Sequence, residues 1–350
     1  MKKIIIGNNL LRKLDSLFDF GQFSKIVILT DTNVAKHWLS VVKKSFKQKT
    51  PEIIIDPGEN EKNIETVKMI WKKMFELELD RQSLLINLGG GVICDMGGFA
   101  ASTFMRGIDF LNVPTTLLSQ VDAGIGGKTG IDFIDIKNGI GVFKEPIGTV
   151  IDVETLKTLP KREFVSAFGE IIKHGVISGR EYFDFATSKK PEEFDQNALI
   201  KIIKGSVNIK SNIVKKDPKE EGLRKVLNFG HTIGHAVESL SWKIDKPLLH
   251  GEAVAIGMVA ESYLACLSRP TYNLGGYATA NIIKRVIINA GLPTKIKNIK
   301  TKDILKMILT DKKNISGKVN WSLPKKIGEV EINIKVPQEQ IVKAIKSIII

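Results

Sequence analysis

The sequence predicts an α/β N-terminal domain followed by a mainly helical C-terminal domain. Short, continuously apolar runs alternate with helical segments in the first part of the chain, whereas helical periodicity dominates after about Thr155. The 350 residues also exceed one typical domain of about 100–200 residues. We therefore expect an α/β domain over residues 1–155 and a mainly α-helical domain over residues 156–350.

The predicted strands of the first domain are short runs of successive apolar residues. They are Ile4–Ile6, Ile26–Leu29, Ile53–Ile55 and Leu84–Leu88. Between them, Asn9–Phe18 and Asn63–Leu77 have the apolar spacing of amphipathic helices. Apolar strands separated by helices are typical of a parallel sheet that is covered on both faces.

The second domain is predicted to contain seven helices and one small hairpin. The helices are Arg162–Ile177, Asn197–Val214, Leu223–Leu240, Gly251–Leu267, Tyr277–Asn289, Thr301–Leu309 and Gln338–Ile348. The hairpin would pair Val319–Leu323 with Glu329–Val336. No linker rich in proline, glycine or serine marks the boundary between the domains.

Three successive glycines, Gly89-Gly90-Gly91, follow a predicted strand and open a helix. Glycines there let the backbone approach a phosphate, and the helix N-terminus supplies amide donors. The dinucleotide fingerprint G-x-G-x-x-G is incomplete, because Cys94 stands at its third glycine. Two interpretations remain at this point, a phosphate cradle and a structural tight turn.

The stretch from Asp122 to Thr129 is similar to the P-loop motif but does not match it. Asp122 stands at the required first glycine, and the residues after Thr129 lack the helix that a P-loop needs. The stretch therefore does not favour a nucleotide triphosphatase of that type. Lys128, flanked by glycines, remains a candidate anion-binding group, with a solvated turn as the alternative.

The formal net charge of +14 comes from lysines scattered along the whole chain. The plain account is a lysine-rich surface. Nucleic acid is the sharper alternative, but there is no basic tail or long cationic run, and a small polyanionic substrate fits the positive charge just as well. Cys94 and Cys266 lack metal-type spacing, which suits a reducing compartment. The first residues are too short for a signal peptide, and no run reaches transmembrane length. We therefore expect a cytoplasmic protein without a membrane partner.

Three of the five histidines lie close together in the second domain, at His231, His235 and His250. His231 and His235 are spaced i and i+4, so a helix would present both rings on one face. This spacing is common among metal ligands but also occurs in solvated or hydrogen-bonded core histidines. Spacing alone leaves open which groups would complete a coordination shell.

Several segments, taken together and in order, resemble the 3-dehydroquinate synthase family of the shikimate pathway over nearly the whole chain. They are Pro57-Gly58-Glu59 with Lys62, Gly89–Val92 with Asp95, Met105–Gly107, Val113–Leu118, Val121-Asp122, Gly126–Gly130, Lys137-Asn138, Glu170–Lys173, Gly222–Arg224, Leu227–Glu238, His250–Glu252 and Asp311–Lys313. The departures are Ala123-Gly124, where serines are frequent, and Asp132, where asparagine is usual. None of these departures falls on a position with an implied catalytic role.

The resemblance implies an NAD-binding first domain and a metal-binding second domain, and a homodimer. It implies Zn²⁺ or Co²⁺ bound by Glu170, His231 and His250, and it makes His235 a catalytic residue that faces the substrate. The implied cofactor-binding residues are Asp31, Asn33, Glu59, Lys62, Gly90, Gly91, Val92, Asp95, Thr115, Thr116, Lys128, Lys137 and Thr158.

The implied activity is that of a lyase in the route to chorismate and the aromatic amino acids. It converts 3-deoxy-D-arabino-heptulosonate 7-phosphate into 3-dehydroquinate and phosphate, through a transient oxidation by NAD⁺ that is reversed within each cycle. The residues implied at the phosphate are Arg106, Lys128, Asn138, Lys312 and Lys313. Those implied at the carboxylate are Lys210 and Arg224, with Lys173, Asn228 and Asp122 lining or orienting the site. We further expect Arg224, Asn228 and His231 on neighbouring rows of one continuous helix.

Three other functions compete with this interpretation. A related sugar-phosphate cyclase would act on a substrate without the carboxylate, although this chain keeps Lys210 and Arg224. A metal-dependent polyol dehydrogenase shares the glycine turn and the histidine helix, and it would release NADH. A nucleic-acid-binding protein would use the +14 charge and would bind DNA in a salt-dependent manner.

Overall fold

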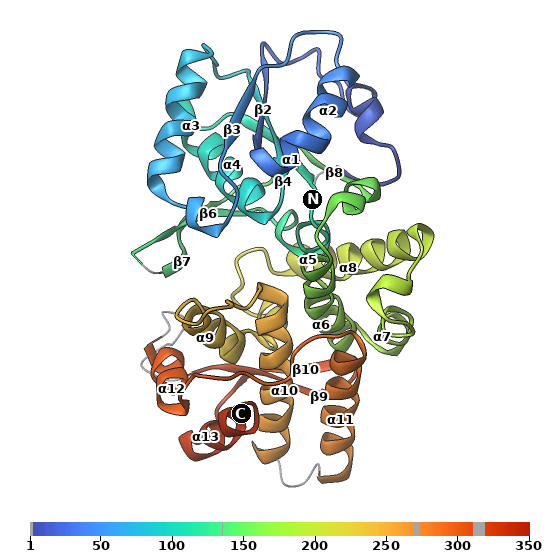
Figure 1. Ribbon diagram of the computed structural model, residues 1–350, viewed down its shortest axis with the longest axis vertical. Coiled ribbons are helices and arrows are strands. Elements are labelled where there is room, and N and C mark those ends of the chain that lie inside the picture. The colour runs from blue at the N-terminus through green and yellow to red at the C-terminus, as the bar shows by residue number, and fades with distance from the viewer. Residues whose placement is uncertain (1–2, 135, 269–272, 311–318) are drawn as a thin grey trace. The chain divides into compact units, whose positions relative to one another are not determined.

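The computed structural model describes residues 3–134, 136–268, 273–310 and 319–350, and it divides the chain into two compact units (Figure 1). They are Met1–Pro160 and Lys161–Ile350. The boundary expected from the sequence lay at residues 155 and 156. The structure instead keeps the 3-10 helix Val153–Thr158, which follows the last strand of the sheet, in the first unit.

The first unit is built on a six-stranded parallel sheet with the order β1-β8-β5-β4-β2-β3. Its strands are β1 (Lys3–Gly7), β2 (Ile26–Asp31), β3 (Glu52–Ile55), β4 (Leu84–Gly89), β5 (Asp109–Pro114) and β8 (Gly148–Asp152). The four predicted apolar runs form β1 to β4, which confirms the predicted parallel sheet. β5 and β8 were not predicted, because polar residues such as Asn112 and Thr149 interrupt their apolar runs.

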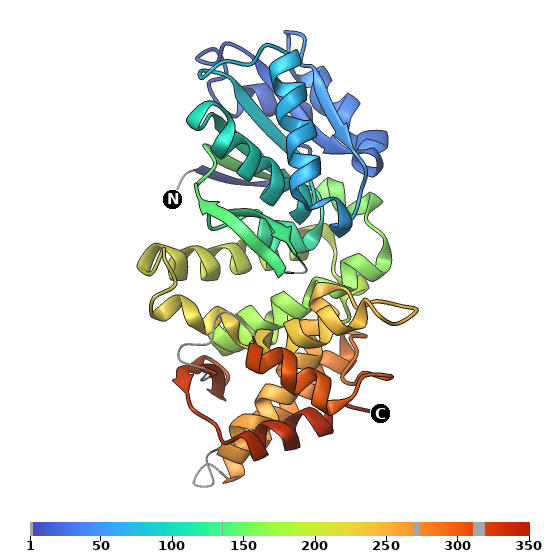
Figure 2. The same cartoon turned by 90° about the vertical axis from the view of Figure 1, so that its left-hand side faces the viewer.

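Helices cover both faces of this sheet, as Figures 1 and 2 show. The helices of the first unit are α1 (Thr32–Val34), α2 (Ser40–Ser45), α3 (Ile64–Glu76) and α4 (Gly91–Thr103). Val27 and Leu29 of β2 belong to the core under α3 and α4, whereas Ile26 and Ile28 pack towards α2. The helix expected over Asn9–Phe18 is only a 3-10 helix, Leu11–Ser16, with a kink at Lys13.

A separate antiparallel hairpin, β6 (Lys128–Phe133) and β7 (Ile136–Phe143), follows the glycine-rich stretch that has a false likeness to a P-loop. A strand therefore stands where a P-loop would require a helix. The hairpin carries three residues with implied roles, Lys128, Lys137 and Asn138.

The second unit is mainly helical, as predicted. Its helices are α5 (Lys161–Ser166), α6 (Phe168–Ser178), α7 (Arg180–Ala186), α8 (Gln196–Lys216), α9 (His231–Ser241), α10 (His250–Ser268), α11 (Asn273–Asn289), α12 (Thr301–Thr310) and α13 (Gln338–Ser347), and β9 (Trp321–Lys326) pairs with β10 (Glu329–Ile334). The almost fully buried α10 contacts α6, α9, α11 and α13. Among the described residues, no helix combines the length and the apolar character needed to cross a bilayer.

The helix expected over Leu223–Leu240 is wrong. A 3-10 helix, Leu223–Asn228, ends before Phe229, and α9 begins at His231 after Gly230. Gly230 has φ of 80°, a left-handed conformation that glycine adopts without a steric penalty. Arg224 and Asn228 therefore do not share a helix with His231.

We predict that Gly97→Ala destabilises the first unit. A Cβ atom at Gly97 would lie 2.7 Å from Cγ of Asn87 and 2.8 Å from Cδ2 of Leu29, inside the core between α4 and the sheet. Because overpacking a core costs about 1–3 kcal/mol, the free energy of unfolding in urea should fall by about that amount. Gly21→Ala is the control, since a Cβ there would come no closer than 3.4 Å to Asp19. Equal stability of the two variants would contradict the packing described.

Candidate metal centre and cofactor-binding residues

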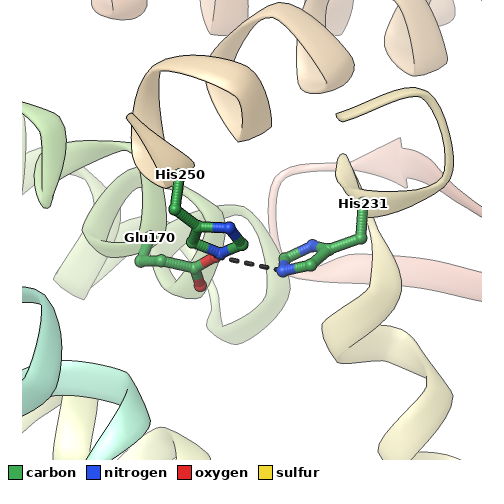
Figure 3. Close-up of side chains that lie close together, drawn as sticks. All are labelled: Glu170, His231 and His250. Atoms are coloured by element: carbon green, nitrogen blue, oxygen red, sulfur yellow. Dashed lines mark ion pairs between the residues drawn. The ribbon is translucent and has the colours of Figure 1, made fainter. Parts of the chain in front are cut away.

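Glu170, His231 and His250 converge from three different helices of the second unit, α6, α9 and α10 (Figure 3). The Nε2 atoms of His231 and His250 lie 3.1 Å and 3.3 Å from the same oxygen, Oε1 of Glu170. One ligand atom from each side chain lies within 4.8 Å of the other two. The structure therefore brings together the three residues that the resemblance implies as metal ligands.

A glycine adjoins each of these three residues. A Cβ at Gly169 would lie 2.8 Å from the carbonyl carbon of Gly251, and one at Gly251 would lie 2.6 Å from that of Ser166. A Cβ at Gly230 would meet Cγ of Met258 at 2.6 Å. The three segments thus approach so closely beside the converging side chains that only glycine fits.

The hydrogen bonds behind the two histidines indicate which ring nitrogen faces Glu170 as a lone pair. Nδ1 of His231 lies 3.1 Å from the carbonyl oxygen of Phe229, and Nδ1 of His250 lies 3.0 Å from Oε2 of Glu238. Because an acceptor at Nδ1 favours a proton there, the neutral form of each ring carries its lone pair on Nε2, the nitrogen beside Glu170. Carboxylate oxygen and two imidazole nitrogens held in this way are the donor set that divalent zinc or cobalt prefers, so these residues fit such an ion.

Burial and neighbouring charges shift the pKa values of all three residues. Burial opposes the ionised form of Glu170, but Lys173 and His231 hold its pKa well below the usual range. Burial also opposes a charge on His250, yet the carboxylates of Glu238 and Glu170 raise its pKa to about 10. Burial lowers the pKa of His231, so its ring stays neutral more readily.

Lys173 and His235 lie beside this cluster. Lys173 forms an ion pair with Glu170 and donates a hydrogen bond of 3.4 Å to the carbonyl oxygen of Leu227. The ring of His235 stands one helical turn after His231, with ring centroids 5.1 Å apart. Its ligand atoms group with those of Glu238 and His250 rather than with Glu170. His235 is therefore placed next to the candidate metal ligands without completing their set.

Arg224 lies near the start of the 3-10 helix Leu223–Asn228, which follows a loop that Asp217 organises. The carboxylate of Asp217 accepts hydrogen bonds from the backbone amides of Glu221, Gly222 and Arg224. The guanidinium of Arg224 donates a hydrogen bond of 2.6 Å to the carbonyl oxygen of Pro218, and Arg224 is only 2% exposed. The side chain of Arg224 is therefore held inside the protein rather than on its surface.

Two more residues with implied roles lie in the second unit: Asn228, implied in the polar lining, and Lys210, implied at the substrate carboxylate. Asn228 is the last residue of the 3-10 helix, and its side-chain amide donates a hydrogen bond of 2.8 Å to Oε1 of Glu220. Lys210 is buried in α8. Because Asn228 and Arg224 belong to the same 3-10 helix, the loop at Asp217 positions both.

In the first unit, several of the implied cofactor-binding residues follow three adjacent strands. Asp31 ends β2 and Asn33 comes soon after it, Gly90 follows β4, and Thr115 with Thr116 follow β5. The chain leaves β2 towards β3 but leaves β4 towards β5 on the other side, so the strand order reverses between β2 and β4. In open parallel sheets, ligands bind at the carboxyl ends of the strands beside such a reversal.

Two short-range features shape the chain at this edge of the sheet: a side-chain cap on α1 and a glycine cap on α4. The side chain of Asp31 caps α1 by accepting hydrogen bonds from the amides of Asn33 and Val34. Gly90 caps α4 without a side chain, and a Cβ there would lie 3.1 Å from Cγ2 of Thr116. Gly91 and Val92 form the first turn of α4, where the backbone amides of a helix attract phosphate.

Lys62 links this edge to the hairpin. Its Nζ atom lies 2.6 Å from Oδ2 of Asp95 and 2.6 Å from Oδ1 of Asn138. Burial opposes its charge, but Asp95 and Glu59 together raise the pKa of Lys62. Lys137 reaches Oε1 of Glu59 at 3.7 Å. Five residues with implied roles therefore form one connected polar cluster.

The remaining predicted residues are more scattered. Arg106 ends a short 3-10 helix with φ of 71°, and Lys128 begins β6. Thr158 accepts 2.8 Å from Nε1 of Trp38. Asp122 lies in the π-helical turn Ser119–Ala123 of the first unit. Lys312 and Lys313 lie outside the residues that the structure describes.

Sequence reasoning did not assign roles to three residues that orient the cluster. Glu238 holds His250, and a bidentate pair between Arg162 and Glu252, at 2.8 Å and 2.7 Å, holds the start of α10. Glu252 also accepts 2.9 Å from the amide of Leu249. The available signal for Glu238 was its position seven residues after His231, on the same helical face.

Comparison with known proteins gives one consistent result. Residues 52–166 match the family model described as 3-dehydroquinate synthase N-terminal, and residues 167–314 match the one described as 3-dehydroquinate synthase C-terminal. A 3-dehydroquinate synthase from Prochlorococcus marinus is 42% identical over 98% of this chain and 92% of its own length.

Solved structures with the same fold include two sugar-phosphate cyclases. A 2-epi-5-epi-valiolone synthase from Streptomyces hygroscopicus, with NAD⁺ and Zn²⁺ bound, is 25% identical with a TM-score of 0.88, over 99% of this chain and 96% of that one. A 2-deoxy-scyllo-inosose synthase complexed with carbaglucose-6-phosphate, NAD⁺ and Co²⁺ is 21% identical with a TM-score of 0.87, over 98% of this chain and 96% of that one.

Proposed function

The chain belongs to the 3-dehydroquinate synthase family, and we propose that it converts 3-deoxy-D-arabino-heptulosonate 7-phosphate into 3-dehydroquinate and phosphate. The observation that carries the proposal is identity of 40–42% to proteins of that name over 90% or more of this chain. The identity to the two cyclases with other products is 21–25%. The lyase reaction is therefore preferred to those of the related cyclases.

We propose that the divalent ion is held by Glu170, His231 and His250. The support is the shared approach to Oε1 of Glu170 and the hydrogen bonds that fix both imidazoles from behind. A divalent ion held there would supply polarisation of the substrate's hydroxyl oxygens, and bound NAD would supply reversible hydride transfer. Lys173 balances the buried charge of Glu170. His235, whose ring centroid lies 5.1 Å from that of His231, would exchange a proton with the bound substrate.

We propose that NAD binds at the edge formed by the ends of β2, β4 and β5. The first turn of α4 would receive the pyrophosphate, since Gly90 caps the helix without a side chain. Asp31 and Asn33, at the end of β2, would contact the ribose, and Lys62 with Asp95 would support the neighbouring loop. The roles of Glu59, Thr115, Thr116, Lys137 and Thr158 in binding NAD are part of the same proposal.

The substrate carries a phosphate and a carboxylate, so several cations are needed to bind it. We propose Arg106, Lys128 and Asn138 for the phosphate, and Lys210 and Arg224 for the carboxylate. The excess of positive charge, +14 overall, favours association with such an anion. We also propose that the protein works in the cytoplasm as a homodimer, with a small molecule rather than nucleic acid or a membrane as its partner.

The proposal is tested by following phosphate and NADH in the same reaction. With trace NAD⁺, the heptulosonate phosphate should release one phosphate per 3-dehydroquinate formed over many turnovers, without lasting NADH absorbance. A chelator should stop the release, and added Zn²⁺ or Co²⁺ should restore it. Stoichiometric NADH accumulation would identify a polyol dehydrogenase instead. Turnover only of a carboxylate-free sugar phosphate would identify another cyclase.

A further inference from the structure

The N-terminus of α9, where the candidate ligand His231 stands, lacks a cap from its own residues. The residue before it is Gly230, which has no side chain to accept a hydrogen bond from the first amides of the helix. Amides at the start of a helix have no partner within the helix and must find one elsewhere when they are buried. Gly230 and Ile233 are both buried, so the cap must come from another part of the chain.

Glu261 of α10 supplies this cap. Its Oε2 atom accepts a hydrogen bond of 2.6 Å from the backbone amide of Gly230. Its Oε1 atom accepts one of 2.9 Å from the backbone amide of Ile233. The side chain of Glu261 is fully buried. A buried carboxylate is costly unless it is compensated, and two amide hydrogen bonds at a positive helix end provide that compensation.

The same face of α10 carries the other candidate histidine ligand. His250, Val254, Gly257 and Glu261 follow one another at i, i+4, i+7 and i+11, which is one stripe along a helix. At Gly257 the backbone of α9 is so close that a Cβ would overlap the carbonyl oxygen of Gly230 and lie 2.7 Å from the amide of Gly234. The start of α9 therefore lies directly on the stripe that begins at His250.

We propose that Glu261 is a positioning residue for the metal centre. It fixes the start of α9 on α10, and with it the separation of His231 from His250. Glu261 would touch neither metal nor substrate, and its effect would reach the ion through the placement of His231. This inference rests on the proposed metal site but not on the reaction that the site carries out.

The test compares Co²⁺ and Zn²⁺ binding by the whole protein and its Glu261→Gln variant. Glutamine keeps the size of the side chain but turns an NH₂ group towards one of the two amides, so one hydrogen bond and the charge are lost. We expect Zn²⁺ affinity, measured by competition with a chelator, to fall about 10- to 100-fold, the range typical of groups that orient metal ligands. The visible ligand-field spectrum of the Co²⁺ protein should shift, because the geometry at the ion changes.

Ser262→Ala is the matched control on the next residue of α10. Ser262 is as deeply buried, and within the described part of the chain its hydroxyl makes no hydrogen bond. This control should keep both the affinity and the spectrum of the unchanged protein. If Glu261→Gln fails to fold, Glu261→Asp, which keeps the charge on a shorter side chain, decides the question in the same assay.

The possible outcomes separate the inference from the proposed function. A folded Glu261 variant with lower thermal stability but unchanged Zn²⁺ affinity and Co²⁺ spectrum would overturn the positioning role. Failure of the unchanged protein to bind Co²⁺ or Zn²⁺ would overturn the proposed metal site itself. A weakened and spectrally altered site in the Glu261 variant alone supports the inference.

Discussion

Glu170→Gln is expected to remove the metal and the activity together. Glu170 is fully buried, and the Nε2 atoms of His231 and His250 both lie close to its Oε1 atom. Loss of the carboxylate charge should lower Zn²⁺ affinity by more than the roughly 10- to 100-fold that follows changes in orienting groups. Turnover should fall at least about 10³-fold, because the ion's stabilisation of developing charge is lost. Metal content after dialysis and phosphate release measure the two effects, and His231→Ala and His250→Ala should behave alike.

His235→Ala is the matched comparison for this set. Its ring neighbours His231 and His250 with centroids 5.1 Å and 5.9 Å away, but its ligand atoms group with Glu238 rather than Glu170. We expect this variant to keep its zinc and lose turnover. Stoichiometric loss of zinc from it would show that the ligand set is assigned wrongly.

A second control deals with the charge left behind by Glu170→Gln. Lys173 is 1% exposed and would lose the partner of its ion pair, which alone destabilises a protein. Lys173→Met in the same chain removes that unpaired charge. The double variant should regain stability without regaining zinc. Recovery of zinc in the double variant would mean that stability, and not coordination, caused the loss.

Arg224→Lys is expected to be far from conservative. If the guanidinium grips the substrate carboxylate, a single ammonium cannot reproduce its two-pronged geometry. We expect kcat/KM for the carboxylated substrate to fall by the equivalent of about 2–4 kcal/mol of transition-state stabilisation. Steady-state phosphate release with each variant measures this loss.

The control for Arg224 is the substrate rather than another variant. Arg224 also donates to the carbonyl oxygen of Pro218, so its loss can loosen the loop at Asp217. A loosened loop should slow a carboxylate-free analogue as well, whereas loss of the carboxylate contact should leave that analogue unaffected. Normal turnover of the natural substrate by Arg224→Ala would refute the carboxylate assignment and favour a related cyclase.

The sequence predicts those elements whose apolar residues form a recognisable pattern within a short stretch of the chain. Uninterrupted apolar runs predicted β1 to β4, because strands buried on both faces have apolar residues at every position. β5 escaped prediction because Asn112 interrupts it. The structure shows why a polar residue is tolerated there. The side-chain amide of Asn87, on the neighbouring strand β4, donates a hydrogen bond of 3.0 Å to Oδ1 of Asn112. Such a pairing depends on strand neighbours that no local pattern reveals.

The candidate site shows the same division. The i, i+4 spacing of His231 and His235 is correct for one helix, yet it suggests a joint role as ligands that the geometry does not favour. The third ligand, Glu170, comes from a distant helix, so only the resemblance pointed to it. The broken helix before His231 was predictable in principle from Gly230, whose left-handed φ lets the chain turn.

The glycines beside the three converging side chains limit how this centre could be moved to another protein. A designer who copies Glu170, His231 and His250 onto three ordinary helices would place them too far apart, because helices with side chains at the contact are spaced about 8–10 Å between their axes. Gly169, Gly230 and Gly251 remove the atoms that would hold these segments apart. The portable unit is therefore the close backbone crossing together with its ligands. Directed evolution of the site should tolerate changes in the surrounding side chains far more readily than an alanine at any of these three glycines.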